Sequence, residues 1–128
     1  MKKKEIRTDI NISLPEGVEQ SLCNCGGVNG LISLLPKDSD IEFLSSTYRA
    51  LADNNRIKIL TMLSIQPLCV CVIRAILEIS DSRLSYHLSV LKKTGLIAGE
   101  QKGTWITYSL TDKGREWLDS GKNIADAK

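Results

Sequence analysis

Four cysteines are the side chains with the most distinctive chemistry in this chain of 128 residues. They form two Cys-x-Cys pairs, Cys23-Asn-Cys25 and Cys69-Val-Cys71. In a reducing compartment such pairs are more often metal-binding or redox-active than structural disulfides. Four thiolates suit Cd(II), Pb(II) or Zn(II), and three suit a pyramidal As(III) centre. The sequence therefore predicts a site for a thiophilic metal or metalloid ion, with no organic cofactor.

The two pairs differ in the backbone expected around them. In an extended arm Cys23 and Cys25 share a side, so both can reach one ion. Pro67 predicts a helix start, which places Cys69 and Cys71 where the helix dipole favours thiolate. Residues two apart on a regular helix point to nearly opposite sides. We expect that ligation by both sulfurs distorts the first turn of this helix and so displaces the helix, which directly precedes the next one.

That next helix, over about 81–94, organises the chain. Ser80 or Asp81 can cap its start, and Gly95 can end it in a left-handed cap. Leucines at 84, 88 and 91 predict one apolar face. The opposite face is polar and basic and carries no acid, which suits the major groove of DNA. The DNA-binding residues predicted from this pattern are Ser82, Arg83, Ser85, Tyr86, Ser89 and Lys92 of this helix, with Lys102 further along the chain.

The preceding residues predict three more helices. Ser39 and Glu42 form a capping box for a helix over 39–51, and Asp53 caps a second helix. The third helix spans roughly 67–79. A short connection joins it to the polar helix at 80, and such a pair is a helix-turn-helix.

After Gly95 the period of the pattern changes. Residues 96–100 and 104–110 read as two strands around Gln101-Lys102-Gly103, and a hairpin placed here is a wing. The fold class is therefore mostly α with a β-hairpin wing, a winged helix-turn-helix. We expect three regions: a flexible arm with Cys23 and Cys25 over 1–37, a DNA-binding and dimerisation domain over 38–120, and a frayed end over 121–128.

Charge and composition limit the class of function. The net charge is only +2, but residues 54–115 hold nine Lys and Arg against four Asp and Glu. This local excess is expected of a nucleic-acid surface. No long apolar run or secretion signal is present in the sequence, so we expect a cytoplasmic protein without a membrane partner. No arrangement of catalytic side chains suggests an enzyme or a small-molecule substrate.

Three motifs carry a family resemblance: Ala50-Leu-Ala-Asp-Asn-Asn-Arg-Ile-Lys-Ile-Leu60, Leu68-Cys-Val-Cys71 and Ser85-Tyr-His-Leu-Ser-Val-Leu-Lys-Lys-Thr-Gly-Leu-Ile97. With them, the chain resembles the ArsR/SmtB family of metal-responsive winged-helix repressors, over residues 39–117. The resemblance implies a homodimer that binds a palindromic double-stranded DNA operator and leaves it when metal binds. It also implies that His87 lies near the DNA, which makes His87 a further predicted DNA-binding residue. It further implies dimer contacts around 39–51 and 112–120. The N-terminal cysteine pair resembles the arm of the cadmium- and lead-sensing branch.

Two departures from the family pattern bear on the ion. Arg74 stands where the arsenite-sensing branch commonly has a third cysteine. A last helix is predicted from Asp112 onward, and it has no histidine for a zinc site. The sequence leaves open whether three or four thiolates bind and whether the site crosses the dimer. The alternatives are a repressor of the same fold that responds to thiol oxidation or sulfur species, and a winged helix that binds proteins instead of DNA.

Overall fold

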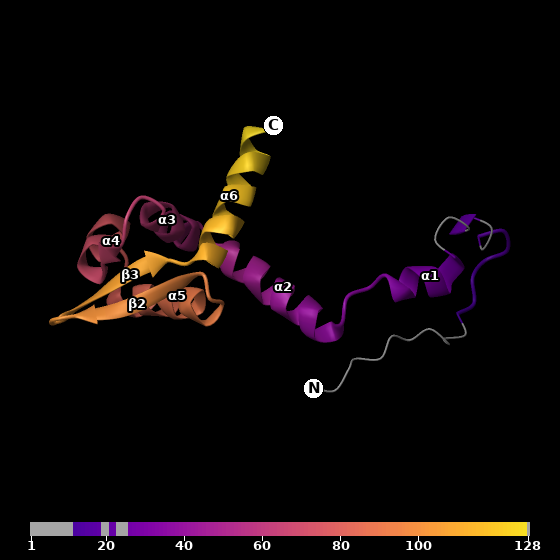
Figure 1. Ribbon diagram of the computed structural model, residues 1–128, viewed down its shortest axis with the longest axis horizontal. Coiled ribbons are helices and arrows are strands. Elements are labelled where there is room, and N and C mark those ends of the chain that lie inside the picture. The colour runs from indigo at the N-terminus through magenta and orange to yellow at the C-terminus, as the bar shows by residue number, and fades with distance from the viewer. Residues whose placement is uncertain (1–11, 19–20, 23–25, 128) are drawn as a thin grey trace. The chain divides into compact units, whose positions relative to one another are not determined.

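The computed structural model describes residues 12–18, 21–22 and 26–127 (Figure 1). It divides into two compact units, one up to Ser45 and one from Ser46 onward. The first unit contains helix α1 (Gly27–Ser33), for which the sequence predicted no element, and the start of helix α2 (Asp38–Leu51). Cys23 and Cys25, two of the four predicted metal ligands, lie outside the described residues.

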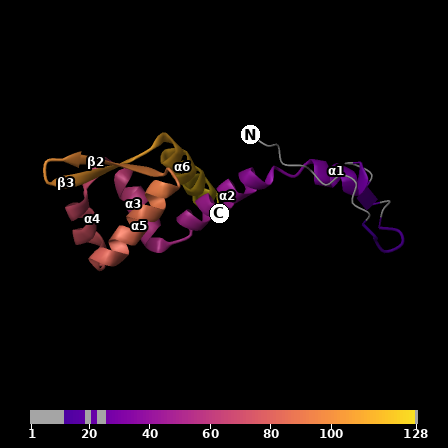
Figure 2. The same cartoon turned by 90° about the horizontal axis from the view of Figure 1, so that it is seen from below.

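The second unit carries the predicted helix-turn-helix and wing. In chain order its remaining elements are α3 (Asn54–Leu63), β1 (Leu68–Cys69), α4 (Val70–Leu77), α5 (Asp81–Lys93), β2 (Ile97–Lys102), β3 (Trp105–Leu110) and α6 (Asp112–Asp126). Figure 2 shows α3, α4 and α5 gathered on one side of the β2–β3 hairpin. The winged helix-turn-helix predicted from the sequence is confirmed.

Local capping explains where the helices of this unit begin. The Asp53 carboxylate accepts a hydrogen bond from the Arg56 N–H at 3.1 Å, and the Ser80 hydroxyl accepts one from the Arg83 N–H at 3.2 Å. Both caps were predicted. The predicted capping box at Ser39 is wrong, because α2 already begins at Asp38 and its first turn closes on the carbonyl of Lys37.

The polar helix α5 ends as its sequence predicts. Gly95 takes a positive φ of 78°. The Leu96 N–H donates to the Leu91 carbonyl and the Gly95 N–H to the Lys92 carbonyl, both at 3.0 Å. This pair of bonds is a Schellman motif, and it turns the chain directly from α5 into the wing.

A core of aliphatic side chains holds α5 against the other helices. The three leucines of its apolar face are buried, as predicted, against residues of α3 and α4. Ile57 of α3 and Ile76 of α4 are exposed, although their spacing in the sequence favours buried positions. The fully buried side chains at the centre are Ile59, Leu60, Leu63, Ile73, Leu91 and Leu96.

The wing has one strand more than predicted. Strands β2 and β3 pair antiparallel up to Lys102 opposite Trp105, so the tight turn is Gly103-Thr104, and Gly103 has φ 63°. The two-residue strand β1 adds to the other edge of β3, which gives the sheet order β1-β3-β2. The predicted helix over 67–79 is therefore shorter, because its first residues belong to this sheet.

Helix α6 is the last element of the unit. The Thr111 hydroxyl donates to the Gly95 carbonyl at 2.6 Å and accepts from the Gly114 N–H at 3.0 Å, which ties the helix start to the end of α5. The helix continues to Asp126, past Gly121, where the sequence predicted fraying. No helix among the described residues is long and apolar enough to span a bilayer.

Candidate metal centre and nucleic-acid interface

Cys69 and Cys71 bring their sulfur atoms together. Their Sγ atoms lie 2.8 Å apart, and the Cys71 N–H also points at the Cys69 sulfur at 3.4 Å. Cys69 is the N-cap of α4, with the extended backbone angles φ −65° and ψ 145°, whereas Cys71 is inside the first helical turn. The expectation that the two sulfurs point to opposite sides is wrong, because only one of the two residues is helical.

The contact makes the two thiols unequal. The hydrogen bond between the two sulfurs lowers the pKa of Cys69 and raises the pKa of Cys71. Backbone N–H groups of the first turn lower the pKa of Cys69 further. Cys69 is therefore the thiol of the pair that ionises more readily, and it is the first to be available as a thiolate.

Two sulfurs are not a complete ion site. Within the described part of the chain, no group of three or more His, Cys, Asp and Glu side chains could hold a metal ion. Thiolate centres for Cd(II) or Zn(II) use four ligands as a rule. Any further ligands must therefore come from the rest of the chain, which contains Cys23 and Cys25, or from a second copy.

Each cysteine belongs to a different part of the second unit. Cys69 pairs with Thr107 in the wing strand β3. Cys71 is in α4, where Arg74 one turn later forms an ion pair at 3.0 Å with Asp81, the first residue of α5. The pair of thiols thus lies at the junction between the wing and the helix-turn-helix.

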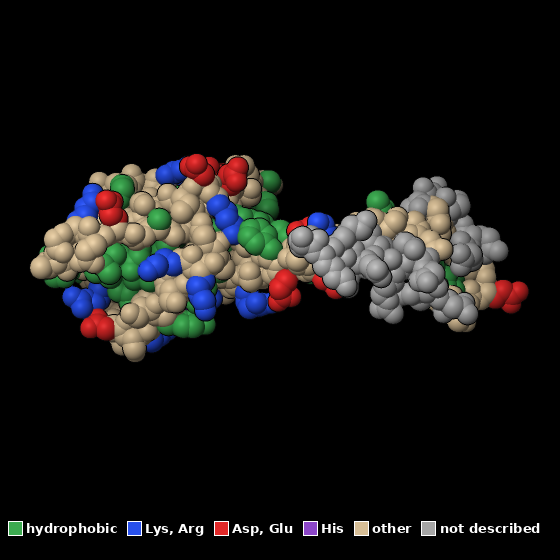
Figure 3. All heavy atoms as spheres, turned by 60° about the horizontal axis from the view of Figure 1, so that its bottom comes forward, with side chains coloured by type: hydrophobic (Ala, Val, Ile, Leu, Met, Phe, Trp, Pro, Cys, Tyr) green, Lys and Arg blue, Asp and Glu red, His purple; other side chains and the backbone are tan. Residues whose placement is uncertain are grey.

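The polar face of α5 is open, as the sequence predicted. Side chains of α5 and of the wing are exposed at seven of the eight predicted DNA-binding positions: Ser82, Arg83, Ser85, Tyr86, Ser89, Lys92 and Lys102. The Lys102 Nζ lies 4.0 Å from the Glu100 carboxylate on the same strand. Figure 3 shows Lys and Arg side chains around an exposed hydrophobic area on the face that it presents.

The eighth predicted DNA-binding residue, His87, is buried, which corrects the prediction. Its side chain is only 5% exposed and points into the unit, where Nδ1 lies 3.0 Å from the Arg56 guanidinium and 3.9 Å from the Asp53 carboxylate. Burial lowers the pKa of His87 below its usual value. A neutral ring can accept the Arg56 hydrogen bond at Nδ1, so His87 supports α5 from inside instead of meeting DNA.

Arg56 is the residue that the sequence reasoning missed. Arg56 is 8% exposed, and its guanidinium donates to the Ala50 carbonyl at 2.7 Å and the Arg49 carbonyl at 3.3 Å. It therefore connects the end of α2 to α5 through His87. The signal was available in the sequence, because Asp53 as a helix cap places Arg56 in the first helical turn.

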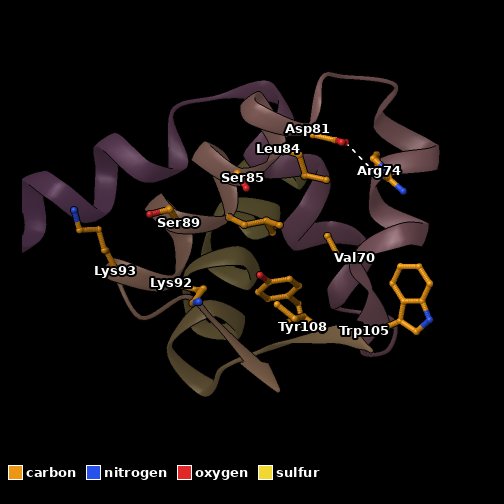
Figure 4. Close-up of a pocket in the computed structure, with 12 residues that line it drawn as sticks. Val70, Arg74, Asp81, Leu84, Ser85, Ser89, Lys92, Lys93, Trp105 and Tyr108 are labelled. Carbon is orange, nitrogen blue, oxygen red and sulfur yellow. Dashed lines mark hydrogen bonds and ion pairs between the residues drawn. The ribbon is translucent and has the colours of Figure 1, made fainter. Parts of the chain in front are cut away.

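A groove of about 600 Å³ lies between α4, α5 and β3 (Figure 4). Ser85, Ser89 and Lys92 line it from α5, and the aromatic rings of Trp105 and Tyr108 line it from the wing. Trp105 is 53% exposed at this groove. The groove joins the polar face of α5 to the wing, which suits it to receive the backbone of a nucleic acid.

Helix α2 has an exposed apolar face. Ile41, Leu44 and Tyr48 recur at helical spacing and are exposed. The Tyr48 ring contacts Trp117 of α6 edge-on, with ring centroids 4.9 Å apart. This face and α6 are the two segments expected to form dimer contacts.

Comparisons with known proteins place these features in a family. The family model "Bacterial regulatory protein, arsR family" matches residues 53–98. The arsenical resistance operon repressor of Bacillus subtilis is 43% identical over 67 residues, which cover 52% of this chain and 64% of that protein. A CadC homolog of Staphylococcus aureus, a cadmium resistance transcriptional regulatory protein, is 37% identical over 71 residues, which cover 55% of this chain and 59% of that protein.

A third relative is matched over most of its length. The uncharacterised HTH-type transcriptional regulator MJ1325 of Methanocaldococcus jannaschii is 33% identical over 72 residues, which cover 56% of this chain and 81% of that protein. The chain spans about six tenths of the length of the arsenical and cadmium relatives.

A solved structure supports the fold. The homodimeric winged helix-turn-helix DNA-binding domain of Mb0332 from Mycobacterium bovis, a possible ArsR-family regulator, superposes with a TM-score of 0.64 at 22% identity, over 69% of this chain and 82% of that one.

Proposed function

Since the chain belongs to the arsR family of bacterial regulatory proteins, we propose that it is a homodimeric repressor that a thiophilic ion releases from its operator. The proteins of this family are DNA-binding transcriptional regulators and not enzymes. One observation carries the proposal: the sulfurs of Cys69 and Cys71 converge at 2.8 Å where the wing meets the helix-turn-helix. Relatives are named for arsenical and cadmium resistance, and both ions bind sulfur.

Cys69 and Cys71 would supply the first two thiolates of the site. With Zn–S bonds of about 2.3 Å, two sulfurs on one tetrahedral ion are roughly 3.8 Å apart. An ion of this kind therefore fixes the spacing of the two sulfurs when it enters. Cys23 and Cys25 are the proposed further ligands, which gives three or four thiolates for Cd(II), Pb(II), Zn(II) or As(III).

By fixing the positions of the two sulfurs, the ion would change how the protein binds DNA. Displacement of Cys69 moves β1, and through its pairing with Thr107 it moves the wing strand β3. Displacement of Cys71 moves α4 and, through the Arg74–Asp81 ion pair, the start of α5. Because the wing and α5 must fit the DNA together, a change in their relative position weakens binding.

The exposed face of α2 and helix α6 are the proposed dimer contacts. A two-fold dimer places two copies of α5 to read a palindromic operator, with half-sites about 10–10.5 base pairs apart. The exposed hydroxyl and cationic side chains of α5, with Lys102 of the wing, are the proposed contacts to bases and phosphates. His87 is left out of this set because it is buried.

Titration of the full-length protein with Cd(II), Pb(II), Zn(II) and As(III), followed by thiolate-to-metal charge-transfer absorbance, tests the site. Cys69→Ser and Cys71→Ser should each abolish or strongly reduce the absorbance. Cys23→Ser and Cys25→Ser should reduce it if the arm supplies ligands. Absorbance that is unchanged in both Cys69→Ser and Cys71→Ser would reject the site.

The same contact supports a second candidate, a repressor that responds to oxidation. Loss of two protons and two electrons from Cys69 and Cys71 would join their sulfurs as a disulfide, while a peroxide is reduced to water or a persulfide to hydrogen sulfide and a thiol. Thiol counting after peroxide or persulfide treatment, beside operator binding, separates the two candidates. Release by oxidant and not by any ion would favour this second reading.

A further inference from the structure

A second cavity lies between the end of α2, α3 and α5. Its volume is about 330 Å³. Neither Cys69 nor Cys71 lines it. The lining residues are Ser46, Arg49, Ala50, Arg56, Tyr86, Val90, Lys93 and Thr94.

The charge of this lining is one-sided. Three of its eight side chains are cationic, one from each helix, and none is acidic. At the inner end, Arg56 is buried with its guanidinium bonded to two backbone carbonyls and to His87. Among the described residues no carboxylate lies within 4.0 Å of that guanidinium. A buried cation bonded only to neutral groups is stabilised when an anion enters beside it.

The cavity continues the proposed DNA surface. Tyr86, an exposed residue of the polar face of α5, lies beneath the Arg56 guanidinium at 5.9 Å from its ring centroid. Lys93 lines both this cavity and the groove between α5 and the wing. An anion here would therefore lie beside the helix that enters the major groove.

We propose that the cavity between α2, α3 and α5 binds a phosphate group of the operator backbone. This inference rests on the proposed DNA binding and adds a contact outside the helix-turn-helix and the wing. Arg49 and Lys93 approach the phosphate from α2 and α5, and Arg56 provides the positive charge behind them. Phosphate contacts carry no sequence information, so this one fixes the position of α5 on the duplex. It also connects the DNA to α2, the helix proposed to form the dimer.

The test uses salt dependence. Operator and non-operator duplexes are titrated with the full-length protein by fluorescence anisotropy over a range of salt concentrations. The variants are Arg49→Gln and Lys93→Gln, with Lys58→Gln as the control, since Lys58 is an exposed lysine of α3 that lines neither cavity. Each lost phosphate contact lowers the magnitude of the slope of log K against log salt by about 0.9. We expect that change for Arg49→Gln and Lys93→Gln on both duplexes, and wild-type behaviour for Lys58→Gln.

Unchanged slopes in both Arg49→Gln and Lys93→Gln, or an equal change in Lys58→Gln, would overturn the proposal. Inorganic phosphate, titrated into the DNA-free protein and followed by amide chemical shifts, is the second arm. Shifts around Tyr86 and Lys93 combined with unchanged DNA slopes would assign the cavity to a free anion and reject the DNA backbone. Reduced slopes in a protein that no ion releases from its operator would retain the phosphate site and reject the proposed sensor.

Discussion

Cys69 lies opposite Thr107 in the sheet, so the first thiol of the Cys-x-Cys pair belongs to the same sheet as the wing. Its partner Cys71 belongs to the helix that precedes α5. An ion held between these two sulfurs would bind two elements that must keep a fixed relation on DNA. The site would thus need no long pathway to affect operator affinity.

The first prediction concerns this pairing. Ion binding should change the amide hydrogen exchange of residues 105–110 in the wing, because displacement of Cys69 strains the β1–β3 pairing. Exchange is followed by mass spectrometry with and without Cd(II) or As(III). The same ion added to Cys69→Ser provides the control. A wing whose exchange is identical with and without bound ion would show that the coupling takes another route.

The second prediction concerns His87 and pH. Burial keeps the pKa of His87 in the folded protein below its usual value, an effect that the nearby Asp53 partly opposes and Arg56 and Arg83 reinforce. In the unfolded chain the ring titrates near 6.5. The unfolded state therefore binds the proton first, and stability present above about pH 6.5 is lost as the pH falls toward the pKa of the folded state.

Urea unfolding at pH 7.5 and pH 5.5 measures this loss. His87→Asn keeps a side-chain oxygen that can accept from Arg56 but removes the titrating group. We expect a smaller loss of stability between the two pH values in His87→Asn than in the wild type. The carboxyl of Asp53 titrates below this pH window, because its pKa is lower than the usual 3.8. Partial desolvation raises this pKa, but the hydrogen bond from the Arg56 N–H and the positive charges of His87 and Arg56 lower it by more. Equal losses in both proteins would mean that His87 does not titrate as described.

The third prediction uses two glycines of α6. A Cβ at Gly114 would lie 2.2 Å from the Leu96 carbonyl oxygen and 2.8 Å from a methyl group of Leu110, whereas a Cβ at Gly121 meets nothing within 4 Å. Gly114→Ala should therefore lower the free energy of unfolding by about 1–3 kcal/mol. Gly121→Ala, the matched control, should raise it by up to about 1 kcal/mol. Denaturant unfolding of both variants gives the comparison, and equal stabilities would contradict the close packing of α6 on the start of β2.

Signals that act within a few residues were readable from the sequence. Ser80 and Asp53 cap their helices, and Gly95 ends α5, because each of these residues interacts with backbone groups close to it. The buried face of α5 was predictable for the same reason, since the helical spacing of its leucines alone indicates which face is apolar. These signals were sufficient for the helix-turn-helix and the wing.

Features that depend on distant contacts were not readable in this way. Strand β1 exists only because Leu68 and Cys69 meet β3 some forty residues later, and this pairing holds Cys69 extended and lets the two sulfurs meet. His87 is a different case. It lies on the same face of α5 as Leu84 and Leu91, so its burial follows from helical spacing, but its neighbours in the family motif suggested DNA contact.

The most direct test of the account is release of operator DNA by an ion. Full-length protein bound to the DNA upstream of its own gene is titrated with Cd(II) and with As(III), and the fraction of bound DNA is measured by anisotropy. We predict that one of these ions releases the wild type, with a coupling of at least 1–3 kcal/mol, and that Cys69→Ser and Cys71→Ser bind the operator normally but stay bound. Dissociation of both variants at the same ion concentration as the wild type would contradict the account.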